Sequence, residues 1–318
     1  MTSEPTTGTA PTAASGSGSG IAAPVQPLLG TSQQRRRKPG GERDANGDPH
    51  RKSGGAYALL TVATLIIFGP FVLALLASLR TNDDYITSTS IWPSEWTLDN
   101  YVSVFTEVPM GRMIFNGLFI AVLATAGNLF SSLIAAFCLA KLRFPGRSQL
   151  FGITLFTMLI PGAVTLIPLY TIIRAIGLVD SPWALILPFW TGSAFAVFFL
   201  RQHLLGIPHE MFEAAILDGC SIPGTIFRIY LPLVRGPLSI LAILNFLASW
   251  NDLLGPLVYL NSPEKMTPTV GLTYFQGQYT TNFPVVLAGA LVILIPTTII
   301  FLIFNRQLRH GMLIGGLK

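Results

Sequence analysis

The residues whose types and spacing favour a chemical role are concentrated in a polar stretch, residues 201–235, between two apolar runs. In this stretch Glu213 is followed directly by Ala214 and Ala215, and then by Asp218. Carboxylates on a short helix can meet basic groups of another protein, and small side chains let its surface approach closely. We therefore expect a protein-docking element here and no catalytic centre.

The elements that must position these residues are indicated by proline, glycine and serine. Pro208 can open a short helix, because a missing amide is harmless in the first turn. Gly219 can end that helix in the left-handed conformation that glycine adopts at low cost. Ser221 then predicts the N-cap of a second short helix with Pro223 in its first turn, and Pro232 marks the approach to the next span. The result is a helix–turn–helix.

Motifs for catalysis or for cofactor binding are absent from the sequence. It contains no Gly-x4-Gly-Lys-Ser/Thr loop for nucleotide and no His-Glu-x2-His, and its histidines are scattered at positions 50, 203, 209 and 310. Cys138 lies in an apolar run and Cys220 in the polar stretch, so a disulfide framework is not expected. We predict a protein that is not an enzyme by itself and binds no metal or cofactor.

The composition predicts a lipid environment for most of the chain. Hydrophobic residues make up 51% of the 318 residues and charged residues only 11%, against about 25% charged in soluble domains. The apolar residues form runs long enough to cross a bilayer. We predict an all-α membrane protein with six spans, at residues 57–79, 113–140, 148–173, 181–200, 236–260 and 283–304.

Residues 1–53 are rich in Gly, Ser, Thr, Pro and Ala, and carry a basic cluster at residues 35–38. Such a segment buries too little apolar area to offset its ordering entropy, so we expect a disordered cytoplasmic tail before a six-span domain at 54–318. The basic cluster either contacts anionic lipid or is a solvated tail that helps to fix orientation. The net charge of +5 comes without a nucleic-acid-binding motif, so no nucleic-acid partner is expected.

The orientation follows from the basic residues of alternate loops. The N-terminal tail, residues 141–147, residues 201–235 and the C-terminal tail hold 16 of the 20 Lys and Arg residues. This split predicts that both termini, and the 201–235 loop, lie in the cytoplasm. The other side holds Arg80, Arg112, Arg174 and Lys265.

One charge lies within a predicted span. Asp252 would sit about 24 Å along a helix that starts near Gly236, and a carboxylate inside the membrane costs roughly 2.5–3.5 kcal/mol unless it meets a polar cavity or partner. We therefore predict that Asp252 and Asn251 face a translocation path or a partner subunit; the alternative is that Asp252 reaches the external interface beside Trp250. Asn116 is a further pathway candidate, for which an interhelical hydrogen bond is the alternative.

Residues 213–232 resemble the EAA loop of binding-protein-dependent ABC importer permeases: Glu-Ala-Ala, three residues, Gly, nine residues, Ile, one residue, Leu-Pro. The resemblance implies the fold of a type I ABC importer transmembrane domain over about residues 57–318. It also implies that the helix from Glu213 to Gly219 couples the permease to a cytoplasmic ATPase. The residues to which it assigns this coupling are Glu213, Ala214, Ala215, Asp218, Gly219, Ile229, Leu231 and Pro232.

Further stretches are similar to the second, shorter permease of the carbohydrate, maltose-type branch: Trp250-Asn251-Asp252, residues 267–272 and Asn305-Arg306. This resemblance implies a bacterial plasma membrane protein that moves a sugar by alternating access. It implies a second permease subunit as a heterodimer partner, two ATPase subunits that bind ATP, and an extracytoplasmic solute-binding protein. Gly255 departs from the branch, which often has a bulky residue there, and leaves the local packing open.

Three alternatives stay open on the sequence. The same machinery could import a polyol, glycerol phosphate, an amino acid or an inorganic anion. An ion-coupled secondary transporter would leave the 213–232 pattern unexplained, since that class expects internal repeats and charges at the bilayer midplane. A membrane enzyme would require a catalytic cluster that the sequence lacks.

Overall fold

The structure is a computed structural model that describes residues 53–276 and 281–315, and the side chains of 55–276 and 281–303. It divides into a unit of residues 1–57, of which only the start of the first helix is described, and a unit of residues 58–318. The predicted disorder of the N-terminal tail therefore falls outside the described residues. The second unit contains nearly all of the residues that the structure describes.

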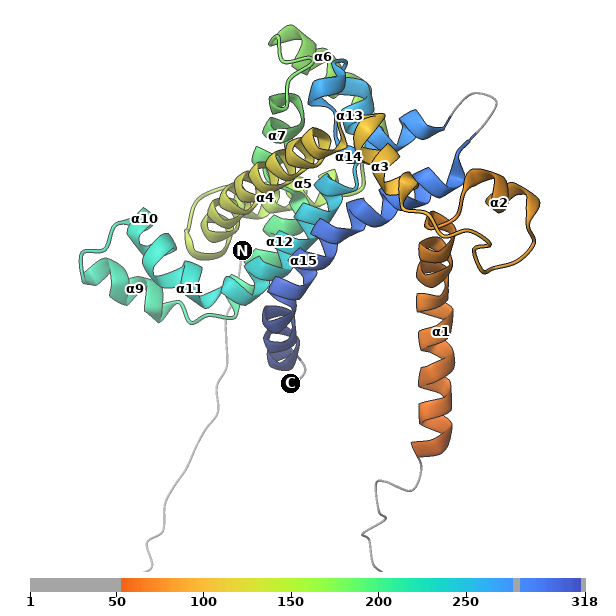
Figure 1. The fold of residues 1–318 in the computed structure, drawn as a ribbon. Helices are drawn as coiled ribbons and strands as arrows, with labels where there is room; N and C mark the ends of the chain where they lie inside the picture. Colours follow the sequence, from red (N-terminus) through yellow and green to blue (C-terminus); the bar gives the residue numbers. More distant parts are fainter. Residues whose placement is uncertain (1–52, 277–280, 316–318) are drawn as a thin grey trace, which may run out of the picture. The chain divides into compact units, whose positions relative to one another are not determined.

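The described chain is helical, and its only extended pairing is a single bridge between Gln276 and Thr281. Figure 1 shows the order of the elements. The longer helices are α1 (Ser53–Ser78), α3 (Asp99–Thr106), α4 (Met110–Lys141), α5 (Arg147–Thr157), α6 (Gly162–Ala175), α7 (Trp183–Trp190), α8 (Ala194–Leu205), α9 (Glu210–Leu217), α12 (Arg235–Trp250) and α15 (Phe283–Gly315). The shorter elements are α2 (Asn82–Thr87), α10 (Ile222–Gly224), the π-helical η1 (Thr225–Tyr230), α11 (Leu231–Leu233), α13 (Leu254–Tyr259), η2 (Pro263–Lys265), α14 (Pro268–Gly271) and η3 (Leu272–Phe275).

Among the described residues four helical stretches are long and apolar enough to cross a membrane, and two bent helix pairs raise the number to six. The four lie at Gly55–Ser78, Met110–Lys141, Trp183–Leu205 and Phe283–Ile303. They agree with the predicted spans at 57–79, 113–140, 181–200 and 283–304, although the second and third extend further. The prediction of an all-α membrane protein is confirmed.

The predicted span 148–173 is wrong as a continuous helix. It consists of α5 and α6, whose axes differ by 102°. Between them Pro161 has an extended backbone (φ −60°, ψ 134°). Because a proline lacks an amide and disfavours a helical conformation for the residue before it, the helix stops ahead of Pro161 and restarts after it.

The predicted span 236–260 is wrong beyond Trp250. Helix α12 ends there, and α13 begins only at Leu254, so Asp252 lies in a non-helical break. Pro256 explains the break, because in a continuous helix its ring would clash with the carbonyl group of Asp252, four residues earlier. That carbonyl group instead accepts a hydrogen bond from Thr269 Oγ1 at 2.8 Å. The start of α12 is also bent, by 84°, from the helical run Ile222–Leu233.

Helix α4 lies at the centre of the packing, in contact with α7, α8, α12 and α14. Small residues allow this close approach. A Cβ atom at Gly127 would overlap the indole of Trp190, whose Nε1 donates to the carbonyl oxygen of Leu123 at 3.0 Å. At Gly117 a Cβ atom would lie 2.7 Å from the Pro268 ring. One end of α4 thus packs against α14 and the segments next to it, and the other end packs against α8.

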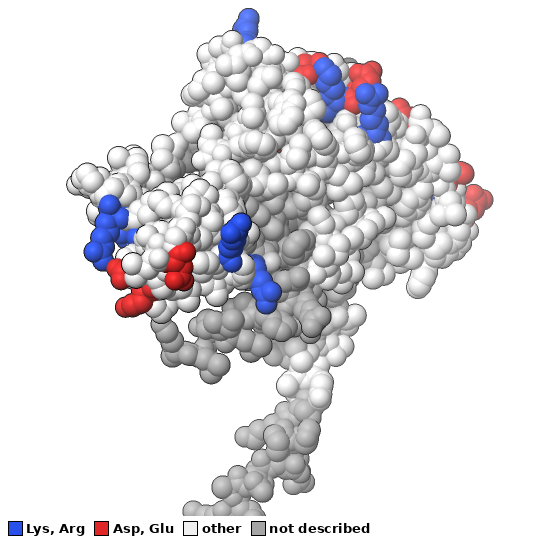
Figure 2. Space-filling model, turned by 90° about the vertical axis from the view of Figure 1, so that its left-hand side faces the viewer, with Lys and Arg blue, Asp and Glu red and all other residues white. Residues whose placement is uncertain are grey.

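The surface of this unit carries many exposed large apolar side chains, including Leu65, Ile66, Ile153 and Ile167, each at least 62% exposed. Figure 2 shows charged side chains at opposite margins of the face it draws, with an uncharged surface between them. An apolar surface of this extent requires lipid or a partner to cover it. The chain is therefore a membrane protein.

Candidate functional site

The predicted helix–turn–helix is present. Helix α9 begins at Glu210 after the N-cap His209, so Pro208 precedes the helix and does not lie in its first turn as predicted. Gly219 ends the helix with φ +77°, as expected. The amide of Cys220 donates to the carbonyl oxygen of Ala215 at 2.9 Å, and the amide of Gly219 donates to that of Ile216 at 3.0 Å. These two bonds form a Schellman motif, which satisfies carbonyl groups that the end of a helix otherwise leaves without partners.

The second half of the turn also follows the prediction. Ser221 caps α10, since its Oγ accepts a hydrogen bond from the amide of Gly224 at 3.3 Å. The chain then runs through η1, where the amide of Leu231 donates to the carbonyl oxygen of Ile226, five residues earlier. Pro232 follows in α11 and has no amide to donate. The run ends in the 84° bend that leads into α12.

Aromatic contacts fix this turn to the end of α4. The ring of Phe137 meets the rings of Phe212 and Tyr230 edge-on, with centroid distances of 5.8 and 5.1 Å. Lys141, only 3% exposed, donates through Nζ to the carbonyl oxygen of Ile207 at 2.6 Å, and Nζ also lies 5.5 Å from the Tyr230 ring centroid. Helix α9 and η1 are therefore packed directly against the end of α4.

The exposed side of α9 combines acidic and apolar side chains. The side chain of Glu213 is 59% exposed, and Nε2 of His209 lies 3.7 Å from one of its oxygens. Ala214 is exposed, whereas Ala215 is only 5% exposed. The expectation that both alanines are exposed is thus wrong for Ala215, because one side of α9 is packed against the chain itself. Leu217 is 87% exposed.

Sequence reasoning missed the apolar part of this surface. Met211 and Ile216 are 38% and 42% exposed, and with Leu217 they are the large apolar side chains that α9 exposes. The signal was the spacing of Met211, Ala214 and Leu217, since residues three apart share one face of a helix. Both the apolar and the acidic side chains are thus available to a partner.

The remaining residues of the 213–232 pattern are divided between half-buried and exposed positions. Ile229 and Leu231 are half-buried and pack against the core cluster around Phe137. Asp218 and Pro232 are exposed, and Asp218 is the residue at which α9 ends. The pattern therefore contains both a surface and the scaffold that holds it.

The structure places the predicted pathway residues in different environments. Trp250 is 1% exposed, stacks on Phe246 at a centroid distance of 5.9 Å, and donates through Nε1 to the carbonyl oxygen of Ile293 at 3.3 Å. The indole of Trp250 thus packs against α15, and a role for it in the pathway stays a prediction. Asn116 donates through Nδ2 to the carbonyl oxygens of Glu264 and Met266 at 2.8 and 3.1 Å, in agreement with the hydrogen-bond alternative.

Asp252 is half-buried in the break between α12 and α13, with Asn251 exposed beside it. Oδ1 of Asp252 accepts a hydrogen bond from the amide of Gly255 at 3.2 Å, so the carboxylate caps the start of α13. A Cβ atom at Gly255 would overlap this carboxylate. The glycine that departs from the carbohydrate branch therefore makes room for the cap.

Two carboxylates outside the predicted spans are held by hydrogen bonds. Asp180, with φ +60°, accepts from the amides of Asn261 and Ser262 at 2.9 Å and from Lys265 Nζ at 2.7 Å, and these bonds lower its pKa, the one from Lys265 most. Arg80 Nε donates to Asp84 Oδ2 at 2.7 Å. This bond, with a second from Ser94, lowers the pKa of Asp84 to about 2. Sequence reasoning missed both carboxylates. The partners of Asp180 are 81 to 85 residues away and meet it only on folding, whereas Arg80 lies just four residues before Asp84, so that pair could have been proposed from the sequence.

Comparison with known proteins decides the family. Residues 127–312 match the family described as the inner membrane component of binding-protein-dependent transport systems. The chain belongs to this family. The predicted resemblance is therefore confirmed, and the chain is a transport component and not an enzyme, as expected.

The arabinooligosaccharides transport system permease protein AraQ of Halalkalibacterium halodurans is 35% identical over 81% of this chain and 93% of its own length. The sulfoquinovosyl glycerol transport system permease protein SmoH of Agrobacterium fabrum is 30% identical over 84% and 95%. The crystal structure of a bacterial ABC transporter for import of the polysaccharide alginate superposes with a TM-score of 0.70 at 22% identity, over 79% of this chain and 94% of that one. The predicted fold, that of a type I ABC importer permease, is confirmed.

Proposed function

We propose that this chain is a permease subunit of an ATP-driven importer and that its solute is a sugar or oligosaccharide. The observation that carries the proposal is family membership together with the names of its relatives, which include permeases for arabinooligosaccharides, sulfoquinovosyl glycerol and lactose. The alginate importer, whose fold this chain shares, was crystallised with a periplasmic protein that holds an alginate pentasaccharide. A polyol or another polar solute is the second candidate.

The exposed side of α9 would be the surface that docks onto a cytoplasmic ATPase. Leu217 and Met211 would enter an apolar groove, while Glu213 and Asp218 would meet basic groups at its margin. The contacts of Phe137 would carry the resulting motion into α4. Gly219 would hold α9 at the angle that this docking requires.

The partners of this machine would be a second permease, two ATPase subunits and an extracytoplasmic binding protein. The chain would lie in a bacterial plasma membrane with both termini in the cytoplasm, as the distribution of its basic residues favours. Nucleotide would bind to the ATPase subunits, and closure of those subunits would move α9. Such a switch requires that nucleotide favour one of the two permease states over the other.

Solute would pass along surfaces shared with the second permease. Asn251 is exposed and Asp252 is half-buried, and their position in a broken helix suits a pathway role, since irregular backbone at membrane depth is tolerated where it lines a cavity. Asp252 would then have two functions, as cap of α13 and as a charge near the path.

The test is reconstitution of the chain with its ATPase, second permease and binding protein in liposomes. We expect uptake of a labelled oligosaccharide that requires ATP and persists when ion gradients are collapsed. Leu217→Arg should abolish co-purification of the ATPase, whereas Leu98→Arg, at a residue 66% exposed elsewhere in the chain, should retain it. Uptake driven by an ion gradient, or undiminished ATPase retention by the Leu217 variant, would overturn the proposal.

A further inference from the structure

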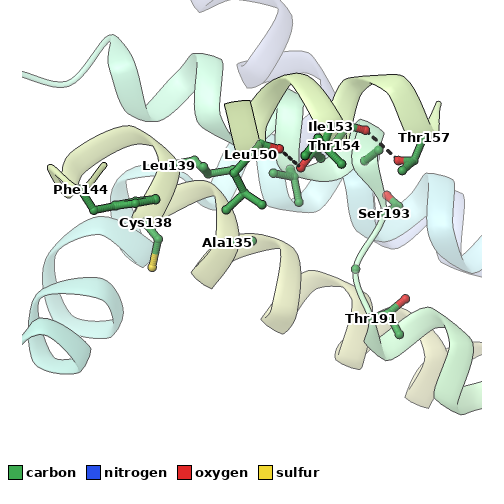
Figure 3. Close-up of a pocket in the computed structure, with 13 residues that line it drawn as sticks. Ala135, Cys138, Leu139, Phe144, Leu150, Ile153, Thr154, Thr157, Thr191 and Ser193 are labelled. Atoms are coloured by element: carbon green, nitrogen blue, oxygen red, sulfur yellow. Dashed lines mark hydrogen bonds between the residues drawn. The ribbon is translucent and has the colours of Figure 1, made fainter. Parts of the chain in front are cut away.

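A cavity of about 370 Å³ lies between α4, α5 and the break that joins α7 to α8. We call it the α4–α5 cavity. Figure 3 shows that it extends from Phe144 at one end to Thr191 and Ser193 at the other. Its walls are formed largely by apolar side chains, among them Leu139, Leu150, Ile153 and Val197.

Three of the four hydroxyl groups in this wall donate within the chain, and the fourth, that of Ser193, accepts a hydrogen bond from the amide of Ala196 at 3.1 Å. Thr154 donates to the carbonyl oxygen of Leu150 at 2.9 Å, Thr157 to that of Thr154 at 2.7 Å, and Thr191 to that of Pro188 at 2.7 Å. These three hydroxyl groups thus donate to backbone carbonyl groups of the chain itself. A sugar would find few donors here, whereas a hydrocarbon chain would meet methyl groups. The wall therefore suits an acyl chain better than a polar solute.

Three arginines lie next to residues that line the cavity or directly follow α4. Arg143 is exposed beside Phe144, and Arg147 donates through Nη1 to the carbonyl oxygen of Leu142 at 3.1 Å. Arg201 donates through Nε to the carbonyl oxygen of Leu139 at 3.1 Å, with its guanidinium 3.9 Å from the Phe151 ring centroid. These arginines lie at one end of α4, next to an apolar opening.

None of these three arginines forms an ion pair with a carboxylate in the described part of the chain. Arg143 makes no hydrogen bond there, and Arg147 and Arg201 each use a single nitrogen. Several guanidinium N–H groups are thus free to donate to a phosphate. Exposed Leu150 and Ile153 on α5 continue the apolar surface towards the bilayer.

We propose that the α4–α5 cavity binds an anionic phospholipid. One acyl chain fills the cavity, and the phosphate accepts hydrogen bonds from Arg143, Arg147 and Arg201. Basic pockets between spans attract anionic headgroups in this way. The site itself does not depend on the proposed import function; only its assignment to the cytoplasmic leaflet depends on the proposed orientation.

The experiment is native mass spectrometry of the full chain, alone and within the isolated importer, with phosphatidylglycerol and phosphatidylcholine of identical acyl chains. We expect the wild type to retain phosphatidylglycerol preferentially. The double variant Arg143→Gln/Arg147→Gln should lose about fivefold in affinity for each arginine, with phosphatidylcholine unaffected. Arg112→Gln, the same change in the first turn of α4, is the matched control and should bind as the wild type does.

Ala135→Leu places a larger side chain in the cavity and should weaken retention of both lipids alike, while thermal unfolding of each variant reports whether it folds. Equal retention of the two lipids by the wild type, or an equal loss in Arg112→Gln, would overturn the proposal. Displacement of the lipid by inorganic phosphate alone would overturn it in favour of a site for a soluble anion. Loss of the lipid on assembly of the importer would overturn it by assigning the cavity to the second permease.

Discussion

The ring of Phe137 meets the ring of Tyr230 edge-on at 5.1 Å, and both side chains are fully buried. Phe137 lies near the end of the long span α4, whereas Tyr230 ends η1, which follows the exposed helix α9. This contact therefore joins the proposed docking element to the membrane-spanning part of the chain. Under the proposed function, this close contact is the route by which a movement of α9 would reach α4.

The first prediction concerns this contact. Phe137→Ala removes a fully buried ring, and such a change costs about 3–5 kcal/mol in folded domains. We expect lower thermal stability and a fall in the number of solute molecules imported per ATP hydrolysed, because α9 would move without carrying α4. The ratio of imported solute to hydrolysed ATP is measured in proteoliposomes.

The control for this prediction is Phe130→Ala. Phe130 stacks on Phe227 at 5.9 Å but is 56% exposed, so its removal should leave the ratio close to that of the wild type. If the Phe137 variant imports with unchanged stoichiometry, the contact has no part in coupling.

The second prediction concerns the end of α9. Gly219 has φ +77°, and a side chain in that conformation costs about 1–2 kcal/mol. Gly219→Ala should therefore loosen the Schellman turn and weaken retention of the ATPase, measured by co-purification, while membrane insertion is unchanged. Gly236→Ala, where a Cβ atom meets open space in a helix, should retain the ATPase. Equal retention by both variants would contradict the role given to Gly219.

The third prediction is that the stability contributed by the Arg80–Asp84 ion pair depends on pH. Hydrogen bonds from Arg80 and Ser94 lower the pKa of Asp84 from 3.8 to about 2. A lowered carboxyl pKa contributes stability above its ordinary value, and this contribution is lost as the pH falls from about 3.8 to about 2. Asp84→Asn should thus unfold at a lower temperature than the wild type at neutral pH.

The difference in unfolding temperature between Asp84→Asn and the wild type should shrink as the pH falls from about 3.8 to about 2. Thermal unfolding in detergent between about pH 6 and pH 2 measures this difference. An Asp99→Asn variant, at an exposed carboxylate without an ion pair in the described structure, is the comparison. A stability difference for Asp84→Asn that stays constant over this range would contradict the assignment.

The fourth prediction separates the two functions given to Asp252. Asp252→Asn keeps an oxygen that can accept the amide of Gly255 but removes the charge, whereas Asp252→Ala removes the cap as well, at about 0.5–2 kcal/mol. We expect impaired uptake in both variants, and lower thermal stability only in the alanine variant. Normal uptake kinetics in the asparagine variant would show that Asp252 serves only as a cap.

The sequence by itself determined the elements that depend on local chemistry. Long apolar runs specify spans wherever lipid is the solvent, and the spacing of Pro208, Gly219 and Ser221 specifies a short helix, its end and the next cap. The 213–232 pattern predicted the family, which the comparison with known proteins then confirmed. The breaks at Pro161 and Pro256 were not determined by proline alone, since Pro70 and Pro296 lie inside the continuous helices α1 and α15.

Only the tertiary structure decided which side of each element is covered. It buried Ala215 and Trp250, and it left Leu217 exposed, because burial depends on which helices pack together and not on residue type alone. It also brought Asp180 to Lys265 and Phe137 to Tyr230, across separations in sequence that no local pattern reports. A sequence specifies spans and caps over a few residues, whereas contacts between distant residues arise only when helices pack and their side chains interlock.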